Sequence, residues 1–285
     1  MITVPRTMDY AAQCMVVSAM QKKYPQLSVR VLGRSRAGRA VFLFTLGEGE
    51  PVLLCGGFHG SEWLTQLLLF RFTESLCTAE DALPPNRKIL IVPCVNPDGT
   101  EIFLRGAQAA GAYAERVDAV WDAKKLWNAN AAGVDINHNF DAGWKTLHAL
   151  EEKNGITGAA PRQYGGPYAE SEPETQMLCD LCRREQPCRA LAFHSQGEEI
   201  FWRYGKTVPP QSEALLEAFV KASGYKPVRN AGLYAHGGFK DWFIETFQKP
   251  AFTVEIGRGR NPLPLGEFET IWQRLREMLM LSVSL

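Results

Sequence analysis

Four short apolar segments, separated by stretches with helical periodicity, constrain the fold of this 285-residue chain more than any other feature. Such segments are typical of strands that are covered on both faces, as in parallel sheets. We predict these strands over Val52–Cys55, Lys88–Val95, Ala190–Phe193 and Ala251–Ile256, and further strands over Val41–Leu46 and Ile200–Tyr204. Helices are predicted over Ser61–Cys77, Ser171–Arg184, Pro210–Ser223, Phe239–Phe247 and Phe268–Leu281. The alternation predicts an α/β fold, with a mixed, mostly parallel sheet sandwiched by helices.

The chain is expected to form a single domain, 1–285, because Pro and Gly are spread along it rather than gathered in one linker. The stretch Thr100–Gly166 has little periodicity, which is typical of a long loop that is either functional or disordered. Just before it, the sequence Asn-Pro-Asp-Gly at 96–99 predicts a turn. Ser171 and Glu174 have capping-box spacing and predict the start of a helix.

Composition excludes some classes of partner. Lys plus Arg and Asp plus Glu each number 31, so no field of one sign is available to capture nucleic acid or an acidic membrane. The first residues lack the basic start and apolar core of a signal peptide, and no apolar segment reaches the length of a membrane span. We therefore expect a cytoplasmic protein, whose oligomeric state the sequence leaves open.

The seven cysteines are scattered and odd in number, which favours reduced thiols over a disulfide framework. Cys179 and Cys182 have the spacing of half a structural zinc site. They lie in a helical pattern with no second pair, so buried thiols are the better interpretation.

His59 and Glu62 follow the apolar strand Val52–Cys55. Their spacing lets an imidazole at a strand end and a carboxylate in the first helical turn converge on one ion, and both ligand types suit zinc. Two ligands are not a complete site, so the pair also fits a helix-start glutamate beside a loop histidine.

His194 and Glu255 each end another predicted strand. Sites in α/β sheets lie at the carboxyl ends of the strands, which places His194 on the same edge as His59. Alone, His194 also fits a core histidine with satisfied hydrogen bonds. Glu255 interrupts an apolar strand, and a buried carboxylate needs a cation or a proton. Its alternative partners are Arg258 and Arg260.

Together these residues resemble the zinc metallocarboxypeptidase family, which includes pancreatic carboxypeptidase A. The pattern is His-x-x-Glu, a distant His-Ser and a glutamate near the C-terminal end. Further matches, in order, are Asn-Pro-Asp-Gly at 96–99, Gly-Val-Asp-Ile-Asn-His-Asn at 133–139, Ser-Glu-Pro-Glu at 171–174 and Gly-Gly-Phe-Lys-Asp-Trp at 237–242.

The resemblance implies a zinc peptidase with one ion, held by His59, Glu62 and His194 with a position left open for water. In this family the metal activates the water and polarises the scissile carbonyl. Glu255 matches the general base that moves the proton to the leaving amine. Asp135 matches the acid that orients the first zinc histidine.

Two departures from the family pattern bear on the substrate. Digestive carboxypeptidases grip the substrate's C-terminal carboxylate with an arginine where this chain has His138, after Asn137, and stabilise the oxyanion with an arginine where it has Asn128. A guanidinium is not replaced by an imidazole or an amide, which disfavours ordinary trimming of C-terminal residues.

A narrower resemblance accounts for both departures. Trp-Asn-Ala-Asn at 127–130, His-Ser-Gln-Gly-Glu-Glu-Ile-Phe-Trp at 194–202 and the segment 255–264 are similar to the bacterial γ-D-glutamyl-diaminopimelate peptidases. The implied substrate is a small, carboxylate-rich cell-wall peptide. A broader carboxypeptidase, a deacylase and an inactive peptide-binding protein are the alternatives.

Substrate-binding candidates follow from the same matches. They are Asn128, Asn137, His138, Lys240, Arg203 and Tyr234. Arg258 and Arg260 are further candidates for pairing with a substrate carboxylate. Lys240 occupies the segment that shapes the family's specificity pocket, where its ammonium is predicted to pair with a substrate carboxylate. The alternative is a solvated lysine at a helix start. His138 either contacts a carboxylate weakly or belongs to the packed loop.

Overall fold

The computed structural model describes residues 7–78, 83–229 and 235–285. Within these ranges the strands form one eight-stranded sheet, in the order β1-β2-β4-β3-β5-β8-β6-β7. The strands are β1 (Ser28–Arg34), β2 (Ala40–Leu46), β3 (Glu50–Cys55), β4 (Arg87–Val92), β5 (Arg189–His194), β6 (Glu199–Phe201), β7 (Lys226–Val228) and β8 (Ala251–Glu255).

The middle of the sheet is parallel, and its flanks are mixed. Strands β4, β3, β5 and β8 all run in one direction. On one side β2 pairs antiparallel with both β1 and β4, and on the other β6 is antiparallel to β8 and parallel to β7. Every residue of β5 is buried, as expected for a central strand. The predicted α/β fold with a mixed sheet is confirmed.

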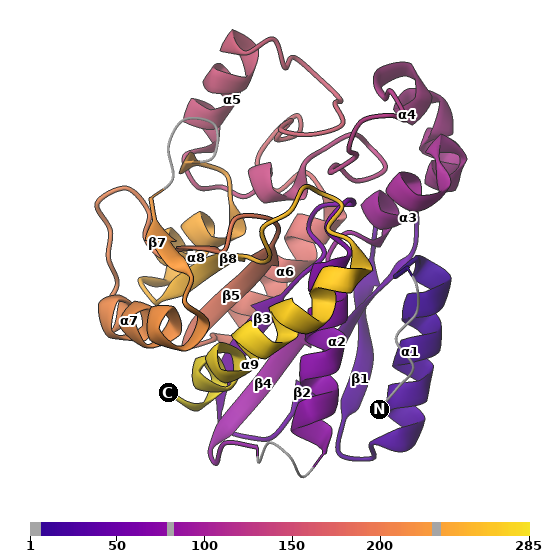
Figure 1. Cartoon of the computed structure of the whole chain (residues 1–285). Coiled ribbons are helices and arrows are strands. Elements are labelled where there is room, and N and C mark those ends of the chain that lie inside the picture. The colour runs from indigo at the N-terminus through magenta and orange to yellow at the C-terminus, as the bar shows by residue number, and fades with distance from the viewer. Residues whose placement is uncertain (1–6, 79–82, 230–234) are drawn as a thin grey trace.

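Helices cover both faces of the sheet (Figure 1). The helices of the described residues are α1 (Tyr10–Lys23), α2 (Leu64–Cys77), α3 (Pro97–Arg105), α4 (Ala114–Val120), α5 (Trp144–Lys153), α6 (Pro173–Glu185), α7 (Ser212–Ser223), α8 (Phe239–Phe247) and α9 (Phe268–Ser284). The alternation of side chains along β3 shows the two layers. Val52 and Leu54 belong to the core formed with α1, α2, α7 and α9, while Leu53 and Cys55 belong to the core formed with α6 and α8.

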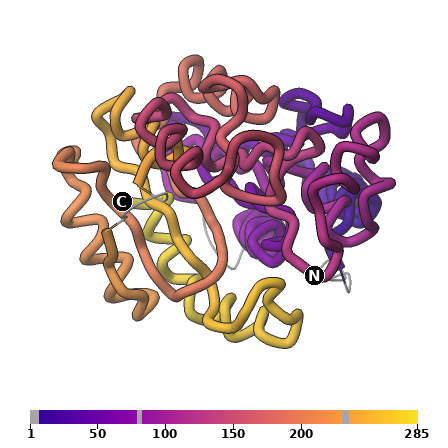
Figure 2. Tube along the Cα trace, turned by 90° about the horizontal axis from the view of Figure 1, so that it is seen from above, coloured from indigo at the N-terminus to yellow at the C-terminus, as the bar shows by residue number. Residues whose placement is uncertain are grey.

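The stretch predicted as a long loop contains helices and lies above the carboxyl ends of the parallel strands. It includes α3, α4, α5 and the short 3₁₀ segments η1 (Ala107–Tyr113) and η2 (Ile136–His138). In Figure 2, which looks down from above, this segment spreads across the top of the molecule. Ile102, Trp127 and Ala129 form part of a small separate core within it. This layer covers the carboxyl edge of the sheet, where the sequence predicts the site.

Two local predictions were wrong. The sequence 96–99 begins helix α3 instead of a turn, because the Asn96 side chain accepts a hydrogen bond from Gly99 N at 2.8 Å and Pro97 occupies the first helical position. The capping box at α6 is absent. Ser171 donates to Glu172 Oε1, and Glu174 accepts from the backbone of Arg36, so neither side chain caps the helix.

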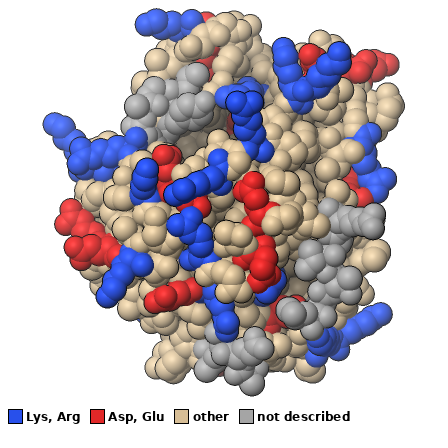
Figure 3. Space-filling model, in the orientation of Figure 1, with Lys and Arg blue, Asp and Glu red and all other residues tan. Residues whose placement is uncertain are grey.

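Three elements near the ends of the chain and of the sheet were not predicted: α1, β1 and β7. In α1 the apolar pattern is weak, since Met15 is 72% exposed while Gln13 is buried. Cys179 and Cys182 are buried in α6 with free thiols. Among the described residues, no helix combines the length and apolar character needed to cross a membrane. On the face of the molecule seen in Figure 3, Lys and Arg side chains are interspersed with Asp and Glu side chains.

Candidate metal centre and active site

Three neighbouring parallel strands bring the predicted residues to one edge of the sheet. His59 lies in the loop that follows β3, His194 is the last residue of β5, and Glu255 is the last residue of β8. His194 and Glu255 are direct neighbours in the ladder between β5 and β8. The carboxyl-edge prediction is therefore confirmed for the backbone positions of these residues.

The loop after β3 is fixed by its own hydrogen bonds. Gly57 N donates to Thr65 Oγ1 at 2.9 Å, and that hydroxyl donates to Glu62 O at 2.7 Å. Helix α2 consequently begins at Leu64, three residues later than predicted, and Glu62 lies in the turn before it. This turn directs the Glu62 carboxylate toward the two imidazoles.

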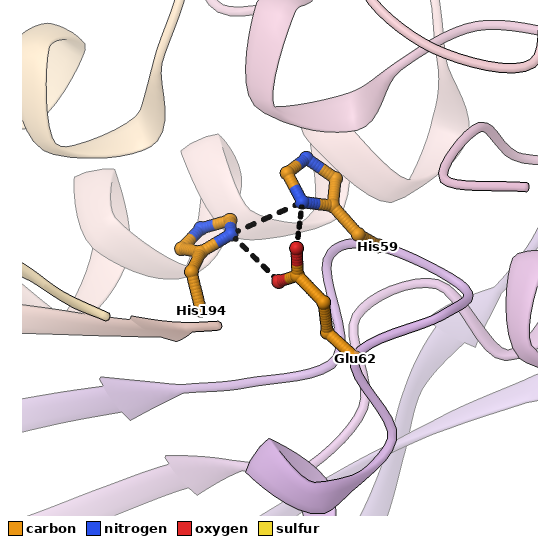
Figure 4. A group of neighbouring side chains, drawn as sticks. All are labelled: His59, Glu62 and His194. Atoms are coloured by element: carbon orange, nitrogen blue, oxygen red, sulfur yellow. Dashed lines mark hydrogen bonds and ion pairs between the residues drawn. The ribbon is translucent and has the colours of Figure 1, made fainter. Parts of the chain in front are cut away.

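His59, Glu62 and His194 point their donor atoms toward one another (Figure 4). Their ligand atoms all lie within 4.8 Å of one another. His59 Nδ1 is 2.9 Å from Glu62 Oε1 and 3.3 Å from His194 Nδ1, and His194 Nδ1 is 3.2 Å from Glu62 Oε2. Donors bound tetrahedrally to zinc at its usual bond lengths are about 3.3 Å apart. The donor set and its spacing therefore fit one zinc ion.

Charge in this cluster also favours a cation. Burial by itself lowers the pKa of His59, but the carboxylates of Glu62 and Asp135 outweigh it and raise that pKa well above the usual value. Burial alone raises the pKa of Glu62, yet His59 and His194 bring it down to about 2. Burial lowers the pKa of His194, which keeps its imidazole neutral as a metal ligand must be.

Outer hydrogen bonds orient two of the three donors. Asp135 Oδ1 lies 3.0 Å from His59 Nε2, on the far side of the ring from the donor nitrogen, while its other oxygen accepts from Gln163 N at 2.8 Å. Glu62 Oε2 accepts from Ser195 N at 3.2 Å, and Glu62 Oε1 accepts from Asn261 Nδ2 at 3.4 Å. These contacts are the kind that set ring and carboxylate orientation in metal sites.

The Glu255 carboxylate accepts no hydrogen bond from the described residues, and it lines the same cavity as the three metal donors. Burial raises the pKa of Glu255 well above its usual value, and the negative charge of Glu62 raises it further. Arg258, one alternative partner, pairs with Glu198 instead, at 2.6 Å. A carboxyl group with a raised pKa beside a metal site has the properties of a general base.

A cavity of about 650 Å³ opens onto these groups. Three residues that are predicted to bind substrate, Asn128, Asn137 and His138, line it. Asn128 Oδ1 accepts from Ser61 Oγ at 2.7 Å. Asn137 Oδ1 accepts from Phe239 N at 3.0 Å, and buried His138 lies 3.4 Å from Glu151.

Two other candidates lie elsewhere. Lys240 does not line the cavity: it is 2% exposed, and its ammonium contacts Asp241 Oδ1 and, at 2.8 Å, the backbone oxygen of Arg203. Both interpretations of Lys240 are therefore corrected, because the start of α8 turns its side chain into the protein. The Arg203 side chain lines an adjoining cavity. Tyr234 lies outside the described residues.

Arg260, a further candidate for pairing with a substrate carboxylate, lines the cavity. Arg162 and Glu199 also line it and are not among the predicted residues, and Asn261, likewise not predicted, supports Glu62. Arg162 comes from an aperiodic segment and carries no local signal. Asn261 precedes a proline just after β8, which marks a turn at the site edge and is a usable signal in retrospect.

Comparisons with known proteins agree with this geometry. The sequence profile of the zinc carboxypeptidase family matches residues 14–278. The γ-D-glutamyl-L-diamino acid endopeptidase 1 of Lysinibacillus sphaericus is 34% identical over 281 residues, covering 93% of this chain and 69% of that protein. Murein peptide amidase A of Escherichia coli K12 is 30% identical over 222 residues, covering 74% of each chain.

A solved structure shows the same fold. Bovine thrombin-activatable fibrinolysis inhibitor superposes with a TM-score of 0.78 at 19% identity, covering 97% of this chain and 96% of that one.

Proposed function

The chain belongs to the zinc carboxypeptidase family, and from this premise we propose that it hydrolyses the amide between γ-D-glutamate and diaminopimelate in cell-wall peptides. One observation carries this proposal. The cavity presents the amide of Asn128 and the imidazole of His138 at the positions where the family's digestive members hold arginines, while Arg162 and Arg260 line it from other segments. Because these arginines lie at other positions than those of the digestive enzymes, the cavity suits a substrate whose carboxylates also lie at other positions than in an ordinary C-terminal peptide.

The proposed substrate has a carboxylate on the γ-linked glutamate and two on diaminopimelate. Guanidinium groups bind carboxylates through paired hydrogen bonds, so each arginine in the cavity is suited to one such group. The 34% identical relative is named for this type of bond, which further supports the proposal.

In the mechanism, His59, Glu62 and His194 hold the ion, which supplies Lewis-acid activation of water and of the amide carbonyl when bound. Glu255 takes the proton of the attacking water and passes it to the departing amine of diaminopimelate. Asp135 keeps His59 in the tautomer that leaves Nδ1 free to donate its lone pair. Asn137 and His138 line the cavity, and in this proposal they contact the leaving residue.

The test is hydrolysis of L-alanyl-γ-D-glutamyl-meso-diaminopimelate, followed by mass spectrometry. A plain α-linked peptide with a free C-terminus is the matched substrate, and each reaction is run with and without a chelator. We expect chelator-sensitive release of diaminopimelate from the first substrate only. Trimming of the plain peptide at a similar rate would contradict the proposal in favour of an ordinary carboxypeptidase.

The proposal includes a cytoplasmic location and action on small wall fragments. Fractionation of the producing cells, with the protein detected by antibody, tests the location.

A further inference from the structure

We infer that a chamber adjoining the catalytic cavity binds the ammonium and carboxylate at the far end of the diamino acid side chain, and thereby selects diaminopimelate over lysine. The inference rests on the proposed function and extends it to one recognition element. The chamber measures about 450 Å³ and is lined by Arg203, Arg229 and Asp241 among others.

The chamber adjoins the catalytic cavity. Asp241 and His236 line both spaces, so these two residues mark where a substrate side chain in the catalytic cavity would come closest to the chamber. Tyr204 OH lies 3.0 Å from His236 Nδ1 and gives the shared wall a polar surface. The boundary between the two spaces is thus polar.

Arg203 supplies the positive side. Its Nε donates to Gly205 O at 3.0 Å and its guanidinium lies 5.8 Å from the centre of the Trp202 ring, which together fix the plane of the group. Its two terminal nitrogens have no acceptor among the described residues. A guanidinium held in place with its outer edge open is suited to a carboxylate.

Asp241 supplies the negative side. Lys240 occupies Oδ1, while Oδ2 has no donor among the described residues. Burial raises the pKa of Asp241, and Lys240 only partly opposes this, so a second cation beside the carboxylate would stabilise its charge. Because Lys240 is turned inward, its role here is to hold Asp241.

Gly238 keeps that oxygen open. A Cβ built on Gly238 would lie 2.9 Å from Asp241 Oδ2, and Gly238 lines the catalytic cavity. The backbone angles of Gly238, φ −81° and ψ 154°, are accessible to any residue, so glycine is not required by conformation. What its missing side chain provides is access to Asp241.

This arrangement matches one class of side chain. Diaminopimelate ends in an ammonium and a carboxylate on the same carbon, whereas lysine ends in an ammonium alone. A polar site built for both groups rejects an analogue that lacks one of them, because a buried charge is then left without its partner.

The experiment compares three γ-D-glutamyl peptides that differ only in the last residue. These are meso-diaminopimelate, L-lysine, which lacks the distal carboxylate, and 2-aminopimelate, which lacks the distal ammonium. The variants are Arg203→Ala and Gly238→Ala, with Arg184→Ala, an exposed arginine on α6 that pairs with Glu185, as the control. Arg203→Ala leaves the backbone contact to Lys240 in place, and Gly238→Ala covers Asp241 without removing its charge.

We expect the native chain to favour diaminopimelate over both analogues by about tenfold or more in kcat/KM. Arg203→Ala should abolish the preference over lysine, Gly238→Ala the preference over 2-aminopimelate, and Arg184→Ala neither. Equal kcat/KM values for the native chain, or preferences unchanged by both cavity variants, would overturn the inference.

Failure of the proposed function gives a different result. If no γ-D-glutamyl bond is cleaved, the proposed function is wrong. Calorimetry with the free amino acids then tests the binding chamber independently of that function. Tighter binding of meso-diaminopimelate than of L-lysine, lost in Arg203→Ala, supports the chamber. Equal or undetectable binding of both amino acids overturns it.

Discussion

Two clusters of buried ionisable side chains lie near the carboxyl edge of the sheet. They differ in whether the chain itself supplies hydrogen-bond donors to their carboxyl groups. The metal-site cluster consists of His59, Glu62, His194 and Glu255. The arginine cluster consists of Arg36, Arg39, Asp98, Glu172 and Glu174, and it ties the loop after β1 to the starts of α3 and α6.

In the arginine cluster each acid accepts bonds from the chain itself. Asp98 accepts from Ser35 Oγ, Ala37 N and Arg39 Nη1 at 2.6–2.8 Å. Glu172 accepts from Arg36 Nε at 3.0 Å. In the metal-site cluster Glu255 has no donor among the described residues, and two imidazole nitrogens face each other at 3.3 Å. Buried acids whose oxygens accept hydrogen bonds from the chain itself indicate a structural role, and a buried acid without such a donor indicates a functional one.

The strongest test of this difference replaces one glutamate in each cluster. Glu255→Gln should lower kcat by about 10³-fold, within the range for loss of a general base, and leave zinc content unchanged. Glu174→Gln, the matched variant in the arginine cluster, should change kcat less than about threefold. Steady-state kinetics and elemental analysis of both proteins measure this. Similar losses of kcat in the two variants would remove the distinction.

The second test should affect stability instead of catalysis. Asp98→Ala removes an acceptor shared by Ser35, Ala37 and Arg39, and breaking a buried pair in this way costs about 3–5 kcal/mol of unfolding free energy. Urea unfolding of the zinc-loaded protein measures it. The control is Glu269→Ala, which removes an exposed partner of Arg71 and should cost less than about 1 kcal/mol. Equal losses of unfolding free energy in the two variants would mean that the hydrogen bonds to Asp98 do not stabilise the fold.

The sequence predicts the metal-site cluster better than the arginine cluster, for a physical reason. Apolar strands are recognisable in the sequence, and parallel strands end at a common edge of the sheet. His59, His194 and Glu255 are therefore brought together by topology alone. Arg36, Asp98 and Glu174 come from three loops and helix starts that meet only through tertiary packing. No local pattern at these residues indicates the meeting.

Side-chain direction was harder to predict than backbone position. The sequence predicts correctly that Lys240 lies at a helix start. However, the first turn of α8 directs its ammonium toward Asp241 and away from the catalytic cavity. Asn96 carries a signal shared by turns and helix starts, and only the packing of α3 decides between them. The role proposed for Asp135 came from family resemblance, since nothing in its local sequence points to His59.

The third test concerns metal affinity. Asp135→Asn keeps the shape of the side chain that contacts His59 Nε2 but removes its charge, so zinc affinity should fall about 10–100-fold. Competition with a chromogenic chelator measures the affinity. Glu172→Gln, from the arginine cluster, should leave zinc affinity unchanged while lowering stability. An unchanged affinity in Asp135→Asn would show that His59 is oriented without this carboxylate.

The last prediction concerns the dependence of stability on pH. Burial, followed by the nearby Asp98 charge, raises the pKa of Glu174 from its usual value to about 8 in the folded chain. The unfolded chain therefore loses this proton at lower pH than the folded chain does. The favourable contribution is fully present below the unfolded pKa and is lost as pH rises toward 8, at about 1 kcal/mol per pH unit.

Urea unfolding of the native chain and of Glu174→Gln between pH 5 and pH 9 isolates this contribution, because other groups titrate alike in both. The native chain should lose stability relative to the variant up to about pH 8 and then run parallel to it. Added zinc should shift both curves by the same amount, since Glu174 lies outside the metal-site cluster. A constant difference across the pH range would mean that Glu174 is already ionised at pH 5 and held by Arg36 N and Asn130, which would make the arginine cluster still more completely satisfied by the chain.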